Sequence, residues 1–125
     1  MSILELKDII KKNMEETKRF TEHVLNIAIN YGGRQEVVYA VNKLLKEGKE
    51  ITVDGISSAL YTADFGEPDL IIRTGGELRT SNFMCYQGAY SELYFTDVLW
   101  PDFTKEELLK AIEWYTGRDR RFGKV

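Results

Sequence analysis

The sequence predicts an α/β fold in which a mostly parallel sheet is flanked by helices. Two kinds of segment alternate along the chain. Some have the alternation or the short apolar run of a strand, and the others repeat apolar residues at helical spacing. Strands that alternate with helices are typical of parallel sheets, because a parallel connection needs a long crossover. The 125 residues suit one domain with a packed core, and we expect it to bury roughly two thirds of the surface of its unfolded chain.

Each predicted element depends on a local pattern. Apolar residues at helical spacing indicate the helices, and β-branched runs bounded by glycine or proline indicate the strands. In order, the sequence predicts a helix over 4–20, a strand over 24–31, a helix over 34–47 closed by Gly48, a shorter helix over 53–61, strands over 69–74 and around 93–95, and a last helix after 104. Thr104 and Glu107, three residues apart, predict a capping box for that last helix.

The stretch from Asp69 to Ser81 carries the clearest chemical signal. Its strand runs into Gly75-Gly76, which permits a turn and should leave backbone N–H groups open to an anion. Arg73, Arg79 and Ser81 add two guanidinium groups and a hydroxyl, and guanidinium groups match paired phosphate oxygens. The stretch therefore predicts a diphosphate site at the carboxyl end of a strand. The competing interpretation is an ordinary turn with solvated arginines.

Several blocks of sequence, taken in order, carry a family resemblance. They are residues 25–34, 68–77, Arg79, 81–83, 89–103 and 120–123. Together they resemble the cis-prenyltransferase family, of the undecaprenyl diphosphate synthase type. The resemblance covers only the C-terminal half of a family member, so residues 1–125 are expected to form a single α/β domain with a partial version of that fold.

The resemblance implies roles for particular residues in isoprenoid biosynthesis. Arg73, Arg79 and Ser81 would hold the diphosphate of isopentenyl diphosphate, which the family condenses with an allylic diphosphate to elongate a cis-prenyl chain. The aromatic segment 86–100 resembles the family's dimer-forming region, which implies a homodimer. The C-terminal substrate-binding residues Arg121 and Gly123 would then reach the donor site of the partner chain.

The resemblance also implies a magnesium cofactor (Mg2+), with Glu92 as a ligand. A carboxylate oxygen suits this hard cation. The alternative for Glu92 is a solvated strand residue or a salt-bridge partner. We expect Glu77 to position the neighbouring arginines. Arg34 could reach a phosphate from a second turn or pair with Glu36 or Glu77, and we expect a structural role for it. His23, the one histidine, is expected to be solvated.

The family's allylic site uses an Asp-Gly-Asn-like turn, which has no counterpart in this sequence. The one Asp-Gly pair, Asp54-Gly55, falls in a predicted helix. No catalytic residue is therefore assigned, and we expect the chain alone to be poorly active, with an N-terminal-half chain as a partner. Two alternatives stay open: a non-catalytic partner subunit of a full-length cis-prenyltransferase, and a stand-alone diphosphate-binding module.

The composition argues against several other classes of protein. A net charge of -3 argues against general nucleic-acid binding. The single cysteine, Cys85, excludes an internal disulfide and suits a cytoplasmic location, and one histidine with one cysteine cannot assemble a zinc site from soft ligands. No apolar run approaches the roughly 20 residues that span a bilayer. Transient membrane contact stays open, because a polyprenyl product is a lipid.

Overall fold

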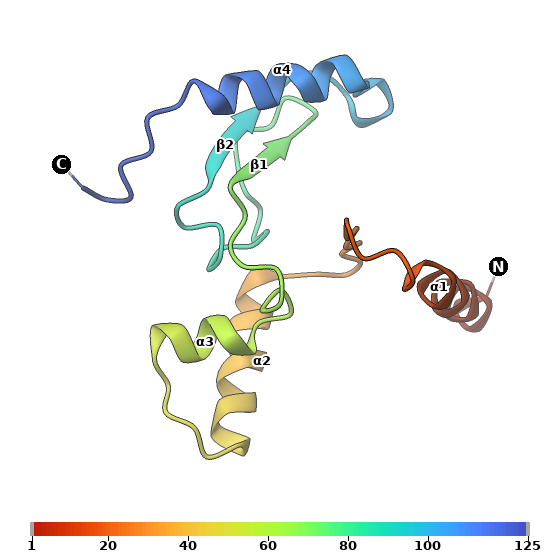
Figure 1. Cartoon of the computed structure of the whole chain (residues 1–125), viewed down its shortest axis with the longest axis vertical. Helices are drawn as coiled ribbons and strands as arrows, with labels where there is room; N and C mark the ends of the chain where they lie inside the picture. The colour runs from red at the N-terminus through yellow and green to blue at the C-terminus, as the bar shows by residue number, and fades with distance from the viewer. Residues whose placement is uncertain (1, 125) are drawn as a thin grey trace.

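The computed structural model describes residues 2–124 and confirms the α/β class with a parallel sheet (Figure 1). The elements of the described chain are, in order, α1 (Ile3–Thr17), α2 (Gly33–Lys46), α3 (Val53–Ala59), β1 (Leu70–Arg73), β2 (Glu92–Phe95), the short 3-10 helix η1 (Trp100–Asp102) and α4 (Lys105–Thr116). None of the described helices combines the length and the hydrophobicity needed to cross a bilayer.

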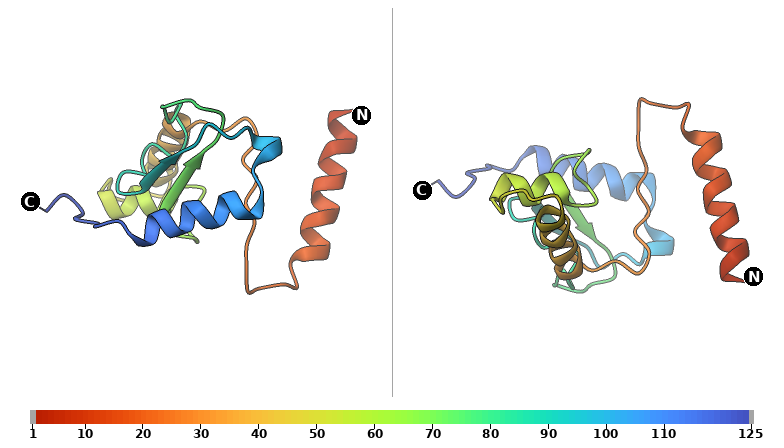
Figure 2. Two further views of the ribbon diagram at one scale, coloured as in Figure 1. Left: turned by 90° about the horizontal axis from the view of Figure 1, so that it is seen from above. Right: turned by 90° about the horizontal axis from the view of Figure 1, so that it is seen from below.

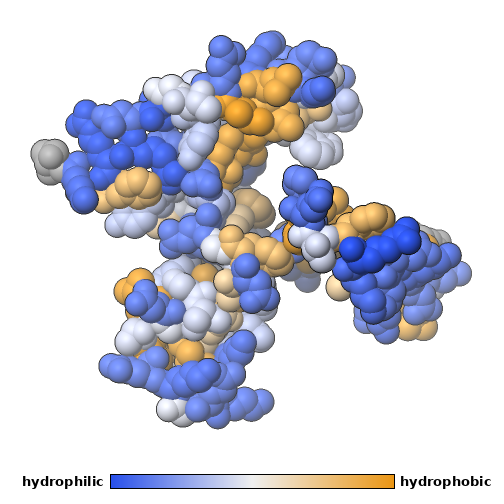
Figure 3. Space-filling model, viewed as in Figure 1, coloured by the Kyte–Doolittle hydropathy of each residue, from blue (hydrophilic) through white to orange (hydrophobic). Residues whose placement is uncertain are grey.

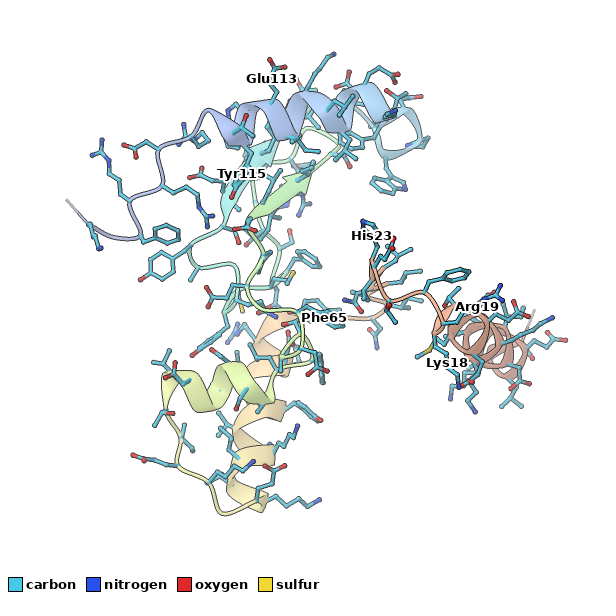
Figure 4. The ribbon with its side chains drawn as sticks, viewed as in Figure 1. Lys18, Arg19, His23, Phe65, Glu113 and Tyr115 are labelled. Atoms are coloured by element: carbon cyan, nitrogen blue, oxygen red, sulfur yellow. The ribbon has the colours of Figure 1, made fainter. Side chains whose placement is uncertain are left out.

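The sheet consists of β1 and β2, paired in parallel from Leu70 opposite Glu92 to Arg73 opposite Phe95. Helix α4 covers one side of it, and the Trp114 ring meets the Tyr94 ring edge to face, with 5.2 Å between centroids. Figure 4 shows Tyr115 on the side of α4 toward the sheet and Glu113 on the outer side. This register places Arg73 and Phe95 together at the carboxyl ends of the strands.

A second packing unit joins α2 to α3. Ala40 and Leu44 of α2 and Ala59 and Leu60 at the end of α3 are buried against one another. The apolar residues of α2 recur at helical spacing on one face, which is why that face can meet α3. Gly48 follows α2 in a left-handed conformation, with φ 65°, and so confirms the predicted helix end.

Helix α1 is capped as an independent unit but contacts little else. Ser2 and Glu5 form a capping box at its start. All of its residues are exposed, and Figures 1 and 2 show it apart from the sheet and from the α2–α3 pair. Apolar side chains such as Ile3 and Leu4 therefore stay in contact with solvent.

The strand predicted over 24–31 was wrong for this chain. The segment belongs to no sheet in the described structure, and its alternating apolar residues are exposed: Leu25 by 85% and Ile27 by 74%. Alternation favours a strand only where a neighbour supplies hydrogen bonds and one covered face. Among residues 2–124, neither is provided here. His23, just before this segment, is exposed as expected, and Figure 4 shows it on the connection between α1 and α2.

The expected burial of two thirds of the unfolded surface was also too high. The accessible surface is 10331 Å² for a chain of 14.5 kDa. A compact monomer of this mass exposes about 6,900 Å² and its unfolded chain about 21,000 Å², so this chain buries only about half. Figure 3 shows hydrophobic surface beside α4, where Leu108, Leu109 and Ile112 are exposed. The core is small because several apolar faces have no partner within the described chain.

The capping box predicted for α4 was wrong as well. Thr104 is the N-cap residue, but its side chain accepts no hydrogen bond from the helix backbone. Glu107 instead pairs with Lys110, one turn along the helix, at 2.8 Å. The pKa of Glu106 is lowered by hydrogen bonds from its own backbone N–H and from the Thr104 side chain. The threonine side chain therefore does not cap the helix.

Candidate functional site

A cavity of about 350 Å³ lies at the carboxyl ends of the two strands. Its polar lining comes from Arg73, Thr74, Arg79, Thr80 and Ser81, and its apolar lining comes from Ile71, Ile72, Phe83, Leu93 and Phe95. The three residues predicted to converge therefore share one concave surface. One part of this surface offers hydrogen-bond donors and the other is hydrocarbon, an arrangement that suits a small amphiphilic anion.

Two other cavities have the wrong charge for an anion. The cavity of about 600 Å³ between residues 26–31 and 61–68 has Glu67 as its one charged lining residue. The cavity of about 270 Å³ beside α3 is lined by Asp54 and Glu67 and by no cation. Of these three cavities, only the one at the strand ends presents guanidinium groups.

Arg73 is the last residue of β1, and its side chain is half-buried. Within residues 2–124 its guanidinium forms no hydrogen bond and no ion pair, although its backbone carbonyl accepts from the N–H of Thr96 at 3.0 Å. A partly desolvated cation without a counter-ion is costly, and an anion in the cavity would relieve that cost.

Arg79 is exposed and holds an ion pair with Glu77, at 2.6 Å between Nη1 and Oε2. Glu77 thus positions Arg79, one of the two arginines that it was expected to position. An exposed pair of this kind contributes at most about 1 kcal/mol. Arg79 can therefore exchange this partner for a more highly charged anion at little cost.

The glycine pair turns the chain as predicted but does not offer its N–H groups. Gly75 and Gly76 have φ values of 88° and 78°, which favour glycine. Their N–H groups donate to the carbonyl oxygens of Val98 at 2.9 Å and Thr96 at 3.0 Å. The expectation of a backbone anion nest was therefore wrong. The pair ties the loop to the segment after β2, and side chains supply the donors.

Sequence reasoning missed Asn82, which connects this loop to α2. Its Oδ1 accepts from the backbone N–H of Arg34 at 2.9 Å, and its carbonyl accepts from the N–H of Gly33 at 2.7 Å. Its Nδ2 donates to Oε1 of Gln35 at 3.1 Å. A signal was present in the sequence, because asparagine beside a serine outside any helix is a common capping residue. Its target could not be read from the sequence.

The expected ion pairs of Arg34 do not form in the described chain, where its exposed side chain has no partner. Glu77 is paired with Arg79, and Glu36 is fully buried and held by other groups. The backbone of Arg34 is what connects α2 to the loop. Arg34 therefore has a structural role through its backbone N–H, and not through its side chain as expected.

Glu36 is the centre of a buried network that the sequence did not reveal. One carboxylate oxygen accepts from the N–H of Tyr61 at 2.8 Å, and the other accepts from the Tyr31 hydroxyl and from Nε2 of Gln87 at 3.1 Å. Burial, and then the nearby Glu36 carboxylate, raise the pKa of Tyr31 well above its usual range. Gln87 also donates to Oγ1 of Thr62 at 3.1 Å. The network holds α2, the turn after α3 and the segment before β2 together.

Glu92, Arg121 and Gly123 do not line the cavity. Glu92 begins β2 and accepts from Nε of Arg118 at 3.1 Å, so it lies three residues, or roughly 10 Å, from the strand end. Arg121 pairs with Asp119 at 3.2 Å, and both are exposed. The structure therefore separates the six predicted site residues into two groups at opposite ends of the sheet.

The carboxylates near the cavity do not form a ligand set for the predicted magnesium ion. No group of three or more His, Cys, Asp or Glu side chains gathers anywhere in residues 2–124. Glu92 faces a guanidinium, which occupies the carboxylate that the ion would need. The residues of one chain therefore do not fit a magnesium site at the cavity.

Arg120 anchors the C-terminal segment, whose other described residues, 117–119 and 121–124, are exposed. Arg120 donates to Oδ1 of Asp69 at 2.8 Å, to the hydroxyl of Tyr115 at 2.9 Å and to the carbonyl of Tyr90 at 3.3 Å. Its guanidinium carbon also lies 4.6 Å from the centre of the Phe122 ring. Arg120 fixes the segment against the amino ends of the strands.

Comparison with known proteins matches nearly all of the chain. The prenyltransferase family model described as "Putative undecaprenyl diphosphate synthase" matches residues 3–123. A protein named isoprenyl transferase from Fusobacterium nucleatum is 58% identical over 121 residues, which cover 96% of this chain and 52% of that protein. One from Thermotoga maritima is 54% identical over 114 residues, with 87% and 49% covered. The chain spans about half the length of these curated relatives.

Solved structures show the same relationship. A probable undecaprenyl diphosphate synthase from Campylobacter jejuni has a TM-score of 0.88 at 31% identity, covering 99% of this chain and 58% of that one. Lavandulyl diphosphate synthase from Lavandula x intermedia, solved with dimethylallyl diphosphate, has a TM-score of 0.86 at 33% identity, with 95% and 54% covered.

Proposed function

Because this chain belongs to the undecaprenyl diphosphate synthase family of prenyltransferases, we propose that it carries the isopentenyl diphosphate-binding half of a cis-prenyl chain-elongating enzyme. The observation that carries this proposal is the cavity shared by Arg73, Arg79 and Ser81. In the proposed reaction, the double bond of isopentenyl diphosphate attacks an allylic carbon as diphosphate leaves, and loss of a proton then forms the new cis double bond.

The cavity suits both parts of such a donor. Within the described part of the chain the guanidinium of Arg73 has no partner, and Arg79 holds a pair that is easily exchanged, so both can bind diphosphate oxygens. The hydroxyl of Ser81 adds a neutral donor. Phe83 and Phe95 provide hydrocarbon for the five-carbon chain. These groups bind and orient the donor, and orientation alone can supply a large part of a rate enhancement.

We assign activation of the allylic substrate to groups other than the residues that line this cavity. The sequence has no Asp-Gly-Asn turn, and the residues of one chain do not fit a magnesium site. Magnesium, when bound with the substrates, would neutralise charge on the diphosphate groups. We therefore propose that the chain alone binds the donor and turns over poorly.

Two partners follow from the proposal. Glu92, Arg121 and Gly123 lie away from the cavity of their own chain, so in a homodimer they would serve the cavity of the second copy. The excess of about 3,400 Å² over the surface of a compact monomer suits an N-terminal-half polypeptide as the second partner. Residues 24–31 would then gain the neighbouring strand that they lack. Under this proposal, residues 1–125 act as one α/β domain equivalent to a C-terminal half.

The test is calorimetric titration of the chain with isopentenyl diphosphate and, separately, with inorganic diphosphate. Arg73→Ala is expected to weaken binding of both by at least about tenfold, because a charge-assisted bidentate contact is lost. Arg34→Ala is the matched control, because it removes an exposed arginine that does not line the cavity. Equal loss in both variants would contradict the proposal. Tighter binding of inorganic diphosphate than of isopentenyl diphosphate would favour a stand-alone diphosphate-binding module.

A further inference from the structure

We propose that Asn82 is a positioning residue, which fixes the Arg79–Ser81 loop by capping α2 from outside the helix. The inference rests on the proposed function for its link to diphosphate binding. The capping itself is a separate claim about the chain without ligand.

The first residues of α2 have unsatisfied N–H groups, as at any helix start. The N-cap residue is Gly32, which has no side chain to accept from them. Asn82 takes that place, although it lies 48 residues from Arg34 along the chain. Its carbonyl accepts from the first N–H of the helix, that of Gly33, and its Oδ1 accepts from the second, that of Arg34. A loop residue thereby becomes part of the helix end.

The two glycines at the start of α2, the N-cap Gly32 and the first helical residue Gly33, leave room for this approach. A Cβ at Gly32 would lie 2.9 Å from Nδ2 of Asn82, and one at Gly33 would lie 3.0 Å from the Asn82 carbonyl and 2.9 Å from the backbone N of Cys85. Contacts this short are rare or absent for a real Cβ, and those at Gly33 are with backbone atoms that cannot turn away. The Gly32-Gly33 pair therefore makes room for the loop.

The capping bonds also explain how Ser81 keeps its conformation. Ser81 and Asn82 have φ values of 49° and 65°, in the left-handed region. Asparagine adopts this region readily, whereas serine does so at a cost that the surroundings must offset. The three hydrogen bonds of Asn82 hold the backbone next to Ser81, and Ser81 and Arg79 line the cavity. Loss of the cap should therefore loosen two of the three donors.

Hydrogen exchange of backbone amides tests the capping, and titration with inorganic diphosphate tests its consequence. Asn82→Gly keeps the left-handed backbone and removes the side chain. We expect exchange at 33–34 to rise about three- to tenfold, as for the loss of a hydrogen bond, and diphosphate affinity to fall by a similar factor. Asn30→Gly is the matched control: Asn30 also has a left-handed φ, 53°, and its exposed side chain makes no hydrogen bond in the described chain.

Asn82→Asp keeps the accepting oxygen and should preserve slow exchange at 33–34. Its added charge would itself repel an anion, so only its exchange is compared. Fast exchange in this variant, or unchanged exchange in Asn82→Gly, would overturn the capping claim. The positioning role would be overturned if Asn82→Gly exchanged faster but kept the wild-type affinity for diphosphate, while Arg73→Ala abolished binding. A wild-type chain that binds no diphosphate would contradict the proposed function and the positioning role, and the exchange data would still decide the cap.

Discussion

The guanidinium of Arg120 donates a hydrogen bond of 2.8 Å to the carboxylate of Asp69, the residue just before β1. This contact joins residues 51 positions apart, and the hydroxyl of Tyr115 on α4 accepts from the same nitrogen. The start of β1, the end of α4 and the C-terminal segment therefore meet at one side chain. Among residues 2–124, the partner of the neighbouring Arg121 is the exposed Asp119, two residues away.

Substitution of Arg120 with methionine should lower the Tm by several degrees, because three hydrogen bonds and the contact with Phe122 are lost. Arg121→Met is the matched control. It makes the same change one residue along, at a side chain exposed by 70%, and should leave the Tm within error of wild type. Thermal unfolding followed by circular dichroism measures both. Equal shifts in the two variants would mean that Arg120 is not the residue that fixes the segment.

Gly33→Ala should destabilise the chain by about 1–3 kcal/mol, because the new Cβ would press on backbone atoms that cannot rotate away. Gly117→Ala is the control: the backbone there has φ -85°, and a Cβ would lie 3.6 Å from its nearest neighbour. Urea unfolding measures the free-energy difference. A neutral Gly33→Ala together with a destabilising Gly117→Ala would contradict the packing of the loop on α2.

These contacts mark the limit of what the sequence could predict. Arg73, Arg79 and Ser81 fall within nine residues around one turn, so local spacing was enough to bring them to one cavity. The helices were predicted to within a few residues because their periodicity is local. The N–H groups of Gly75 and Gly76 were misjudged because their acceptors, Val98 and Thr96, belong to a segment that follows the next strand.

The strand over 24–31 failed for a related reason. Its residues have the right alternation, but a strand exists only with a neighbour, and pairing is not encoded in the strand's own sequence. Asn82 and Glu36 were missed because their partners, apart from Tyr31 beside Glu36, lie 25 to 51 residues away. Residue types are visible in a sequence, whereas long-range hydrogen bonds are properties of the folded chain.

Tyr31→Phe should change how stability depends on pH. Burial and then the Glu36 carboxylate raise the pKa of Tyr31, so the folded state keeps its phenol neutral where the unfolded chain ionises. The resulting contribution is fully present below about pH 10, the unfolded value, and is lost as the pH rises above it. The variant should lose about 1–3 kcal/mol at pH 7, because a buried carboxylate loses a donor.

Between pH 9 and 11, Tyr31→Phe should also show a shallower fall in stability than wild type. Tyr39→Phe, at an exposed tyrosine, serves as the control and should keep the wild-type slope. Urea midpoints at several pH values measure both. An unaltered slope in Tyr31→Phe would show that the buried phenol does not cause the alkaline loss.

Glu92→Gln tests where magnesium would act. Glu92 pairs with Arg118 and lies roughly 10 Å from the strand end, so it should not reach the cavity of its own chain. In protein dilute enough to be monomeric, the variant should bind diphosphate with wild-type affinity, with or without magnesium. Titrations under both conditions measure this. A magnesium-dependent loss of affinity in the monomer would place Glu92 at its own cavity after all.

Turnover by the chain alone is the most demanding prediction. A steady-state assay with farnesyl diphosphate, magnesium and radiolabelled isopentenyl diphosphate should yield negligible long-chain product, because no residue of this sequence matches the family's allylic motif. Addition of an N-terminal-half polypeptide from an isoprenyl transferase relative should restore product, since it would supply that motif and cover the apolar surface around 24–31. The same mixture with Arg73→Ala should stay inactive, and with Arg34→Ala it should be active. Robust product from the chain alone would show that its own residues activate the allylic diphosphate.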